Sequence, residues 1–516
     1  MARFKDYSYE QSRLIPVSFD DQIQPGTIEY TINYLVDNHI DLSGFHRRFH
    51  NDDTGAPAFD PAILLKVVLL AYSRGIVSSR EIARCCEENV VFMALAADSR
   101  PHFTTIAGFI STMDEQIVSV FTDVLTVCYS EGLIGKTMFA IDGCKIAANC
   151  AKEWSGTKKE LLKKAQKIEE SIREIVKKHR DGDQGGGGSG GAAGSEKHRI
   201  ERLEAKTKKI RQWLSENEDR IGERGKPIKS NITDNESAKM PSAHGVIQGY
   251  NGLAAVDENH QIVVHAKAFG KGTEATHLTD MIEGIGTTFA HLDGQKDIYE
   301  QVVVTADSGF HSEESVKQVM ESKVDAYLAD RKFRGREKSF ASAQEYKRKT
   351  VDRKRTSKAR KYFTADEFRY EGGSGKLLCP AGKEMKRRSP NARNREKGYR
   401  GIAYIGKVEN CLLCGLREQC IRKPEVTAVR QVTKYEKGIR HGKVSYAQQM
   451  IERFDSARGR EFYRRRMGTV EPVFANIRST LGLDRFTLRG ERKVNVQWLL
   501  FCVVHNIGKL SRYGMQ

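Results

Sequence analysis

Several common features are missing from this sequence of 516 residues. No apolar run approaches the roughly 18 residues of a membrane span, because the best candidate, residues 62–72, is interrupted by Lys66. The first 13 residues alternate charged and aromatic side chains without an apolar core, so we expect no secretory signal and no membrane partner. Ten cysteines do not make a disulfide scaffold in so long a chain, and a reducing cytoplasm is the simplest expectation.

Acidic residues are in the minority. The chain has 85 Lys and Arg against 67 Asp and Glu, a formal net charge of +18. This excess predicts a polyanionic partner, most simply nucleic acid, although merely soluble basic proteins share it. Residues 331–361 hold 14 Lys or Arg and three acidic residues. The structural interpretation of this stretch is a solvated loop, and the functional interpretation is contact with a phosphate backbone through Lys354 and Arg355.

The first 135 residues are predicted to be helical. Asp60 before Pro61 predicts an N-cap and a first helical position, and Gly75 ends the apolar run that follows. Residues 78–81 fit a capping box for a second helix.

A third helix is expected in the same region. Thr104 or Thr105 is the candidate cap, and apolar residues follow at helical spacing from Ile106 to Leu125. Short helices joined by polar turns suit a DNA-binding domain of the helix-turn-helix type, and they suit other all-helical modules equally well.

The pattern changes to strands after residue 136. Alternating or continuous apolar runs predict strands, and helical spacing predicts two connecting helices, in the order β-β-β-α-β-α-β, which indicates a mixed α/β sheet. The predicted strands cover residues 137–141, 246–256, 261–269, 301–306 and 325–329, and the helices 275–289 and 313–322. An inserted antiparallel helical hairpin is expected at 158–214, with the glycine-rich residues 181–194 as its flexible loop. Residues 446–481 and 494–507 are predicted to be mainly helical.

Three acidic residues are candidates for catalysis. Asp142 and Asp307 each follow a predicted strand, where a carboxylate is held rigidly, although Asp-Gly and Asp-Ser-Gly also begin ordinary turns. Glu471 precedes Pro472, and its structural interpretation is a place in the first turn of a helix. Three acids without a basic partner would repel one another unless a cation neutralised them, and Mg²⁺ or Mn²⁺ suits carboxylate oxygens. Two such ions can support in-line displacement at a phosphodiester.

These segments together resemble the DDE transposases of bacterial insertion sequences, in a branch of type eleven-eighty-two that is related to the type-four group. The resemblance implies an RNase H-like catalytic core. It also implies a bacterial protein that associates with the nucleoid. The segments that carry it are residues 60–61 with the helix after them, 79–82, 100–106, 140–143, 249–251, 306–310 and 469–474.

The resemblance also assigns roles to single residues. Asp142 and Asp307 match the two catalytic aspartates of the family, and Glu471 matches its glutamate. Tyr463, Arg466 and Arg478 are the candidates for contacts to donor-DNA phosphates. Arg466 lies five positions before Glu471 where the related pattern has four, and Arg478 stands where that pattern has lysine.

Four cysteines have the spacing of a metal site. Cys379 precedes the C-x2-C pair of Cys411 and Cys414, and Cys420 follows. Four thiolates can close a tetrahedral structural Zn²⁺ site, and an iron–sulfur cluster or unliganded thiols are the alternatives. The expected module is a small zinc-ribbon-like insertion that holds DNA.

The sequence thus predicts four parts in one chain. These are a helical DNA-binding domain (1–135), the first part of an α/β RNase H-like core (136–330) with a hairpin insertion (155–225), a basic and Cys-rich insertion (331–445), and a helical end that completes the core (446–516). The expected function is a transposase that binds terminal inverted repeats, cuts donor DNA and joins 3′ ends to target DNA, as a homodimer on DNA. A nuclease without strand transfer and a non-catalytic DNA-binding descendant are the alternatives.

Overall fold

The computed structural model of the chain divides into two compact units. The first comprises Met1–Phe310, Lys323–Ala326 and Glu461–Gln516, and the second comprises His311–Ser322 and Tyr327–Arg460. Within the described ranges, no helix combines the length and the apolar character that crossing a lipid bilayer requires. The residues described are 16–48, 57–183, 190–222, 225–242, 245–294, 297–337, 362–371, 376–394, 399–436, 439–440 and 443–514.

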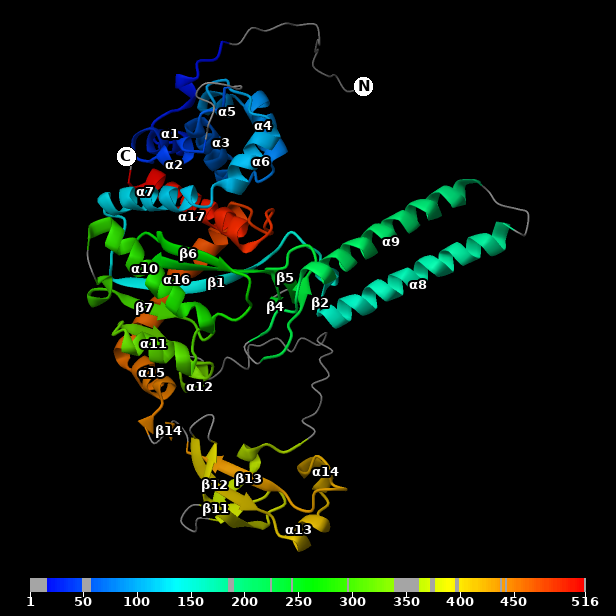
Figure 1. Ribbon diagram of the computed structural model, residues 1–516. Helices are drawn as coiled ribbons and strands as arrows, with labels where there is room; N and C mark the ends of the chain where they lie inside the picture. Colours follow the sequence, from blue (N-terminus) through cyan, green and yellow to red (C-terminus); the bar gives the residue numbers. More distant parts are fainter. Residues whose placement is uncertain are drawn as a thin grey trace, which may run out of the picture. The chain divides into compact units, whose positions relative to one another are not determined.

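The N-terminal part of the first unit is helical, as predicted (Figure 1). The cap at Asp60 is confirmed, because its Oδ1 accepts a hydrogen bond from Ala62 N at 2.8 Å. Gly75, with φ +74°, follows the end of this helix. The helices are α1 (Ile28–Asn38), α2 (Ser43–His46), α3 (Pro61–Ser73), α4 (Ser79–Glu88), α5 (Val90–Leu95), α6 (Phe103–Thr112) and α7 (Gln116–Ser130).

Three expectations for these helices are wrong. The apolar run expected to form one helix is divided between α6 and α7. The spacing of the apolar residues did not reveal the break, because Met113, in the connection between the two helices, is buried like the residues on either side. The cap of α6 is His102, which accepts a hydrogen bond from Thr104 N, in place of Thr104 or Thr105. Ser78 occupies the N-cap position of α4, but its side chain makes no capping hydrogen bond, so the capping box does not form.

A mixed sheet forms the centre of the first unit, and the predicted chain order β-β-β-α-β-α-β is present. The sheet order is β4-β5-β1-β7-β8, and β6 also pairs with β5. β1 is antiparallel to β5 and parallel to β7. The strands and connecting helices are β1 (Met138–Ala147), β4 (Ala238–Ser242), β5 (Gly245–Asp257), β6 (Val263–Phe269), α10 (Leu278–Asp293), β7 (Val303–Ala306), α11 (Glu313–Glu321) and β8 (Ala326–Leu328). Of these, α11 and the last two residues of β8 belong to the second unit.

The helix α17 (Glu491–Tyr513) completes the core of the first unit. The side chains of Asn506 and Asn495 each exchange two hydrogen bonds with the backbone of β6, at Val263 and Ala268 respectively. These amides satisfy the outer edge of β6, which would otherwise carry unpaired backbone groups. α17 is thereby held against the sheet beside α7 (Figure 1).

A long antiparallel hairpin, α8 (Lys158–Asp183) and α9 (Gly190–Glu216), is inserted after β1, as predicted (Figure 1). Its base is held by a small buried cluster that includes Leu161 and Trp213. The short strands β2 (Ser155–Gly156) and β3 (Ser230–Asn231) pair beside it. The expected loop over residues 181–194 is too long, because both helices extend into this glycine-rich segment, and residues 184–189 lie outside the described ranges.

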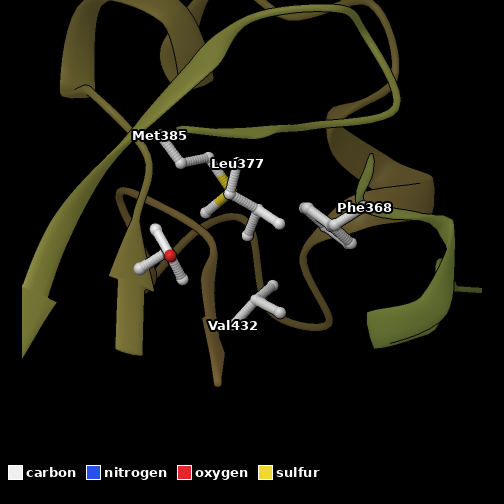
Figure 2. Packing of buried hydrophobic residues seen from close by; sticks show 5 residues of the cluster. Phe368, Leu377, Met385 and Val432 are labelled. Carbon is white, nitrogen blue, oxygen red and sulfur yellow. The ribbon is translucent and has the colours of Figure 1, made fainter. Parts of the chain in front are cut away.

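The second unit contains a small antiparallel sheet of order β13-β12-β11-β10-β9. Leu377, Met385, Phe368 and Val432 pack together on it and form a separate core (Figure 2). Its elements are α12 (Phe333–Arg336), β9 (Arg369–Glu371), β10 (Lys376–Leu378), β11 (Glu384–Asn394), β12 (Tyr399–Ile405), α13 (Val408–Leu412), α14 (Arg417–Cys420), β13 (Gln431–Tyr435), β14 (Ile439–Arg440), β15 (Lys443–Val444) and α15 (Tyr446–Asp455). The helix α16 (Ala457–Ala475) then leads back into the first unit.

Candidate active site

The register of the central sheet brings Asp142 and Asp307 side by side. β1 and β7 are parallel and paired from Met138 with Val303 to Ile141 with Ala306, and each aspartate is the next residue in its chain. Asp307 follows the end of β7, as expected. The expectation that a strand ends before Asp142 is wrong, because β1 continues to Ala147. Its pairing with the longer β5 supplies hydrogen bonds beyond the point where β7 stops.

Asp142 is engaged by an arginine. Its Oδ1 accepts a hydrogen bond from Gly143 N at 2.8 Å, and its Oδ2 lies 2.7 Å from Arg466 Nη2. Arg466 is only 5% exposed. Burial raises the pKa of the Asp142 carboxyl, Arg466 and the Gly143 amide oppose this rise, and the charge of Asp307 adds to it. Asp142 therefore presents no free carboxylate: a cation or phosphate at this residue has to displace or rearrange Arg466.

A further carboxylate, which the sequence analysis missed, lies beside Asp307. Asp307 Oδ1 accepts a hydrogen bond from Gly309 N at 2.6 Å, and Glu274 contacts Gly309. Glu274 lies between β6 and α10, in a polar segment without strand or helix periodicity. The only available signal was an acidic residue shortly after a predicted strand, the same feature that singled out Asp307.

Glu471 lies within α16. The structural interpretation of the Glu471-Pro472 sequence, a place in the first turn of a helix, is therefore wrong. Pro472 is inside the same helix and cannot donate to Gly468 O, four residues earlier. That carbonyl instead accepts a hydrogen bond from Gln261 Nε2 at 3.0 Å. The proline is tolerated because a side chain from the turn before β6 replaces the missing backbone donor. Phe474, on the next turn, stacks with Trp498 of α17 and fixes this part of α16 against the core.

Glu471 and Asp142 line one pocket of about 430 Å³, together with Arg478. Arg478 is exposed and lies in a π-helical turn, residues 476–480, that follows α16. Tyr463 lies one turn before Arg466, with its ring centroid 5.7 Å from the Arg466 guanidinium carbon. The candidate DNA contacts Lys354 and Arg355 lie outside the described residues.

The first unit offers hard oxygen ligands. Among the described residues, no three His, Cys, Asp or Glu side chains come close enough together to form a complete metal site. Mg²⁺, however, keeps several waters and is commonly bound by one or two carboxylates together with substrate phosphate. The carboxylate of Asp307 fits such a cation, and that of Asp142 fits it once Arg466 is displaced. The Asn251 Oδ1, which is buried and lacks a hydrogen-bond partner, also fits such a cation.

The four cysteines of the second unit line one small pocket, together with Arg430. Burial raises the pKa of Cys420, and the other three thiols contribute to the rise. None of them forms a disulfide. The four cysteines that were grouped by their spacing in the sequence therefore lie around one pocket. Within the described residues, their thiols do not form a complete metal site.

Two segments of the chain match models of known protein families. Residues 378–511 match a family described as "Transposase DDE domain", and residues 17–112 match one described as "Transposase domain (DUF772)". No curated protein matches the chain. The first segment contains Glu471, Arg466 and the four cysteines, whereas Asp142 and Asp307 lie outside both segments. A DDE domain implies an RNase H-like core, and the two matches together support a DDE transposase.

Proposed function

We propose that this protein is the transposase of a bacterial insertion sequence of type eleven-eighty-two, related to the type-four group. It binds the terminal inverted repeats, cleaves donor DNA and transfers the 3′ ends to target DNA. The single observation that supports this most is the β1–β7 register, because Asp142 and Asp307 directly follow paired residues at one edge of a mixed sheet. Glu471 lines a pocket with Asp142, and the two transposase-domain matches agree with this reading.

In this mechanism the carboxylate oxygens of Asp142, Asp307 and Glu471 would hold Mg²⁺ or Mn²⁺. When bound, such ions would supply activation of the attacking water or 3′-hydroxyl and stabilisation of the leaving oxygen. Arg478, exposed in the pocket, contacts the phosphate backbone of the bound end. Arg466 exchanges Asp142 for a phosphate oxygen when the end enters. No covalent enzyme intermediate and no ATP are needed, because a hydroxyl attacks the phosphodiester directly.

The other parts of the chain serve DNA binding and assembly. The N-terminal helices and the basic residues bind the element ends, with phosphate contacts that make binding depend on salt. The four cysteines bind one structural Zn²⁺ that stabilises the small sheet of the second unit. Synapsing two ends implies at least two subunits, so the working form on DNA is a homodimer.

A strand-transfer assay tests the function. Labelled duplexes that carry the inverted repeats flanking the coding region are incubated with the full chain, Mg²⁺ and target DNA. We expect Asp142→Asn, Asp307→Asn and Glu471→Gln each to abolish cleavage and joining while end binding is largely retained. Glu283→Gln, an exposed substitution on α10, is the matched control and should leave all three unchanged. Cleavage without joining would instead identify a nuclease, and an unaffected acidic variant would remove that residue from the assignment.

A further inference from the structure

Glu274 and Asp307 converge on the same glycine. Glu274 Oε2 contacts Gly309, and a Cβ at this position would overlap with that oxygen and lie 2.9 Å from Asp307 Oδ1. Any residue other than glycine would therefore displace the Glu274 carboxylate from its position beside Gly309. The position of Glu274 beside Asp307 therefore requires glycine at residue 309. Glycine is common where the backbone has to leave space for a neighbouring group or a ligand.

The cations of the described residues compensate this approach only in part, because the charge of Lys145 opposes the rise in the pKa of Glu274. Among the described residues, no Lys, Arg or His side chain forms an ion pair with Glu274, and Lys145 acts on it only from a greater distance. Burial raises the pKa of the Glu274 carboxyl, and the charge of Asp307 raises it further. Two carboxylates held together in this way repel unless one of them takes up a proton or a cation lies between them.

A buried amide points to a ligand independently of the acids. Asn251, on β5, is fully buried, and its Nδ2 donates a hydrogen bond to Glu274 Oε1 at 3.3 Å. Its Oδ1 has no hydrogen-bond partner and lies beside Gly143, 3.0 Å from where a Cβ would be. Leaving such an oxygen buried without a hydrogen-bond partner is unfavourable. A hydrated cation bound at Glu274 and Asp307 would supply the missing donor through one of its waters.

We propose that Glu274 is a fourth acidic residue of the active site, which binds a divalent cation jointly with Asp307 while Asn251 orients its carboxylate. Two carboxylates and several waters are a sufficient set for Mg²⁺ or Mn²⁺. The cation site is a property of the free protein, and its role in DNA chemistry rests on the proposed function. Asp142 differs from this pair, because Arg466 already neutralises it.

Mn²⁺ binding to the full chain without DNA, measured by electron paramagnetic resonance of the free ion, tests the assignment. We expect Glu274→Gln and Asp307→Asn each to weaken Mn²⁺ binding by about tenfold or more, since even residues that only orient metal ligands contribute about 10–100-fold. Asn251→Ala should weaken it as well. Glu283→Gln, which removes an exposed acid from α10, should have the affinity of the parent.

Gly309→Ala provides a second line of evidence if Glu274→Gln does not fold. It keeps every acidic residue but separates Glu274 from Asp307, so it should also weaken Mn²⁺ binding. Parent-like affinity in a folded Glu274→Gln variant, or in Gly309→Ala, overturns the assignment.

Strand transfer separates the failure of this inference from that of the proposed function. A parent that binds Mn²⁺ through Glu274 but neither cuts nor joins DNA overturns the function and leaves the cation site. An active parent whose Glu274→Gln variant reaches half-maximal cleavage at the same Mn²⁺ concentration overturns the role of Glu274.

Discussion

Arg466 forms an ion pair with Asp142, with 2.7 Å between Nη2 and Oδ2, where it neutralises one of the acidic residues proposed for catalysis. The Arg466 Nε and Nη2 atoms are buried without a hydrogen-bond partner of good geometry. The arginine is therefore incompletely satisfied by Asp142 and remains able to donate to a phosphate. In the proposed mechanism this relationship would make metal binding at Asp142 and DNA binding interdependent, because the metal needs Asp142 and the phosphate needs Arg466.

The first prediction concerns this pair. Arg466→Gln leaves Asp142 without its counter-charge, so we expect the metal-free protein to lose about 3 kcal/mol of unfolding free energy, as when one partner of a buried ion pair is removed. Mn²⁺ should restore more stability in this variant than in the parent, because the ion no longer displaces Arg466. Urea unfolding with chelator and with Mn²⁺ measures both effects.

Arg492→Gln is the control for this experiment. Arg492 pairs with Asp114 but its side chain is 67% exposed, so its removal should change stability by less than about 1 kcal/mol. The same gain from Mn²⁺ in the parent and in Arg466→Gln would contradict the competition between the arginine and the cation.

The second prediction concerns acid lability. His505 is buried in α17, its Nε2 donates to Gln261 O at 2.9 Å, and its Nδ1 accepts from Asn476 Nδ2 at 3.0 Å. Burial lowers the pKa of His505 from 6.5 to about 4. The unfolded chain therefore takes up a proton at higher pH than the folded one. The stability that this histidine contributes is full above pH 6.5 and is lost as the pH falls toward 4, by at most about 3 kcal/mol.

Urea unfolding between pH 7 and pH 5 measures this loss. His505→Gln should make the pH dependence shallower without removing it, because burial also lowers the pKa of His265 to about 4. His198→Gln, at an exposed position of α9, should leave the slope unchanged. A slope in His505→Gln as steep as in the parent would contradict the prediction.

The third prediction concerns the cysteine pocket. If Cys379, Cys411, Cys414 and Cys420 bind Zn²⁺, the purified full chain should contain one zinc ion, and Cys414→Ser should lose it and lower the melting temperature. Elemental analysis with thermal unfolding measures both. Cys150→Ser, a half-buried thiol of the first unit, is the control and should keep the zinc. Metal-free protein that melts at the same temperature as its Cys414→Ser variant would favour unliganded thiols, and visible absorbance with iron would favour a cluster.

Local patterns predicted the elements where a few neighbouring residues decide the structure. The cap at Asp60 and the hairpin of α8 and α9 were correct, because a capping hydrogen bond or an apolar face is contained within one or two helical turns. The strand expected to end before Asp142 was wrong for the opposite reason. β1 continues through polar residues because the distant β5 pairs with them up to Ala147.

The helix around Pro472 shows the same limit. Proline before a helical turn predicts a boundary, and Glu471 was accordingly expected in a first turn. α16 continues because Gln261, more than 200 residues earlier, donates to the carbonyl that Pro472 leaves free. No window of sequence around Glu471 contains that donor.

The amino-acid sequence by itself determined the helical N-terminal part, the order of strands and helices in the α/β core, and the acidic and thiol groups that are available for chemistry. These follow from backbone hydrogen bonding and apolar periodicity, which act over a few residues. Only the tertiary structure decided that Arg466 neutralises Asp142 and that Glu274 converges with Asp307 on Gly309. Such encounters depend on sheet register and helix docking, which are set by contacts between residues far apart in the chain.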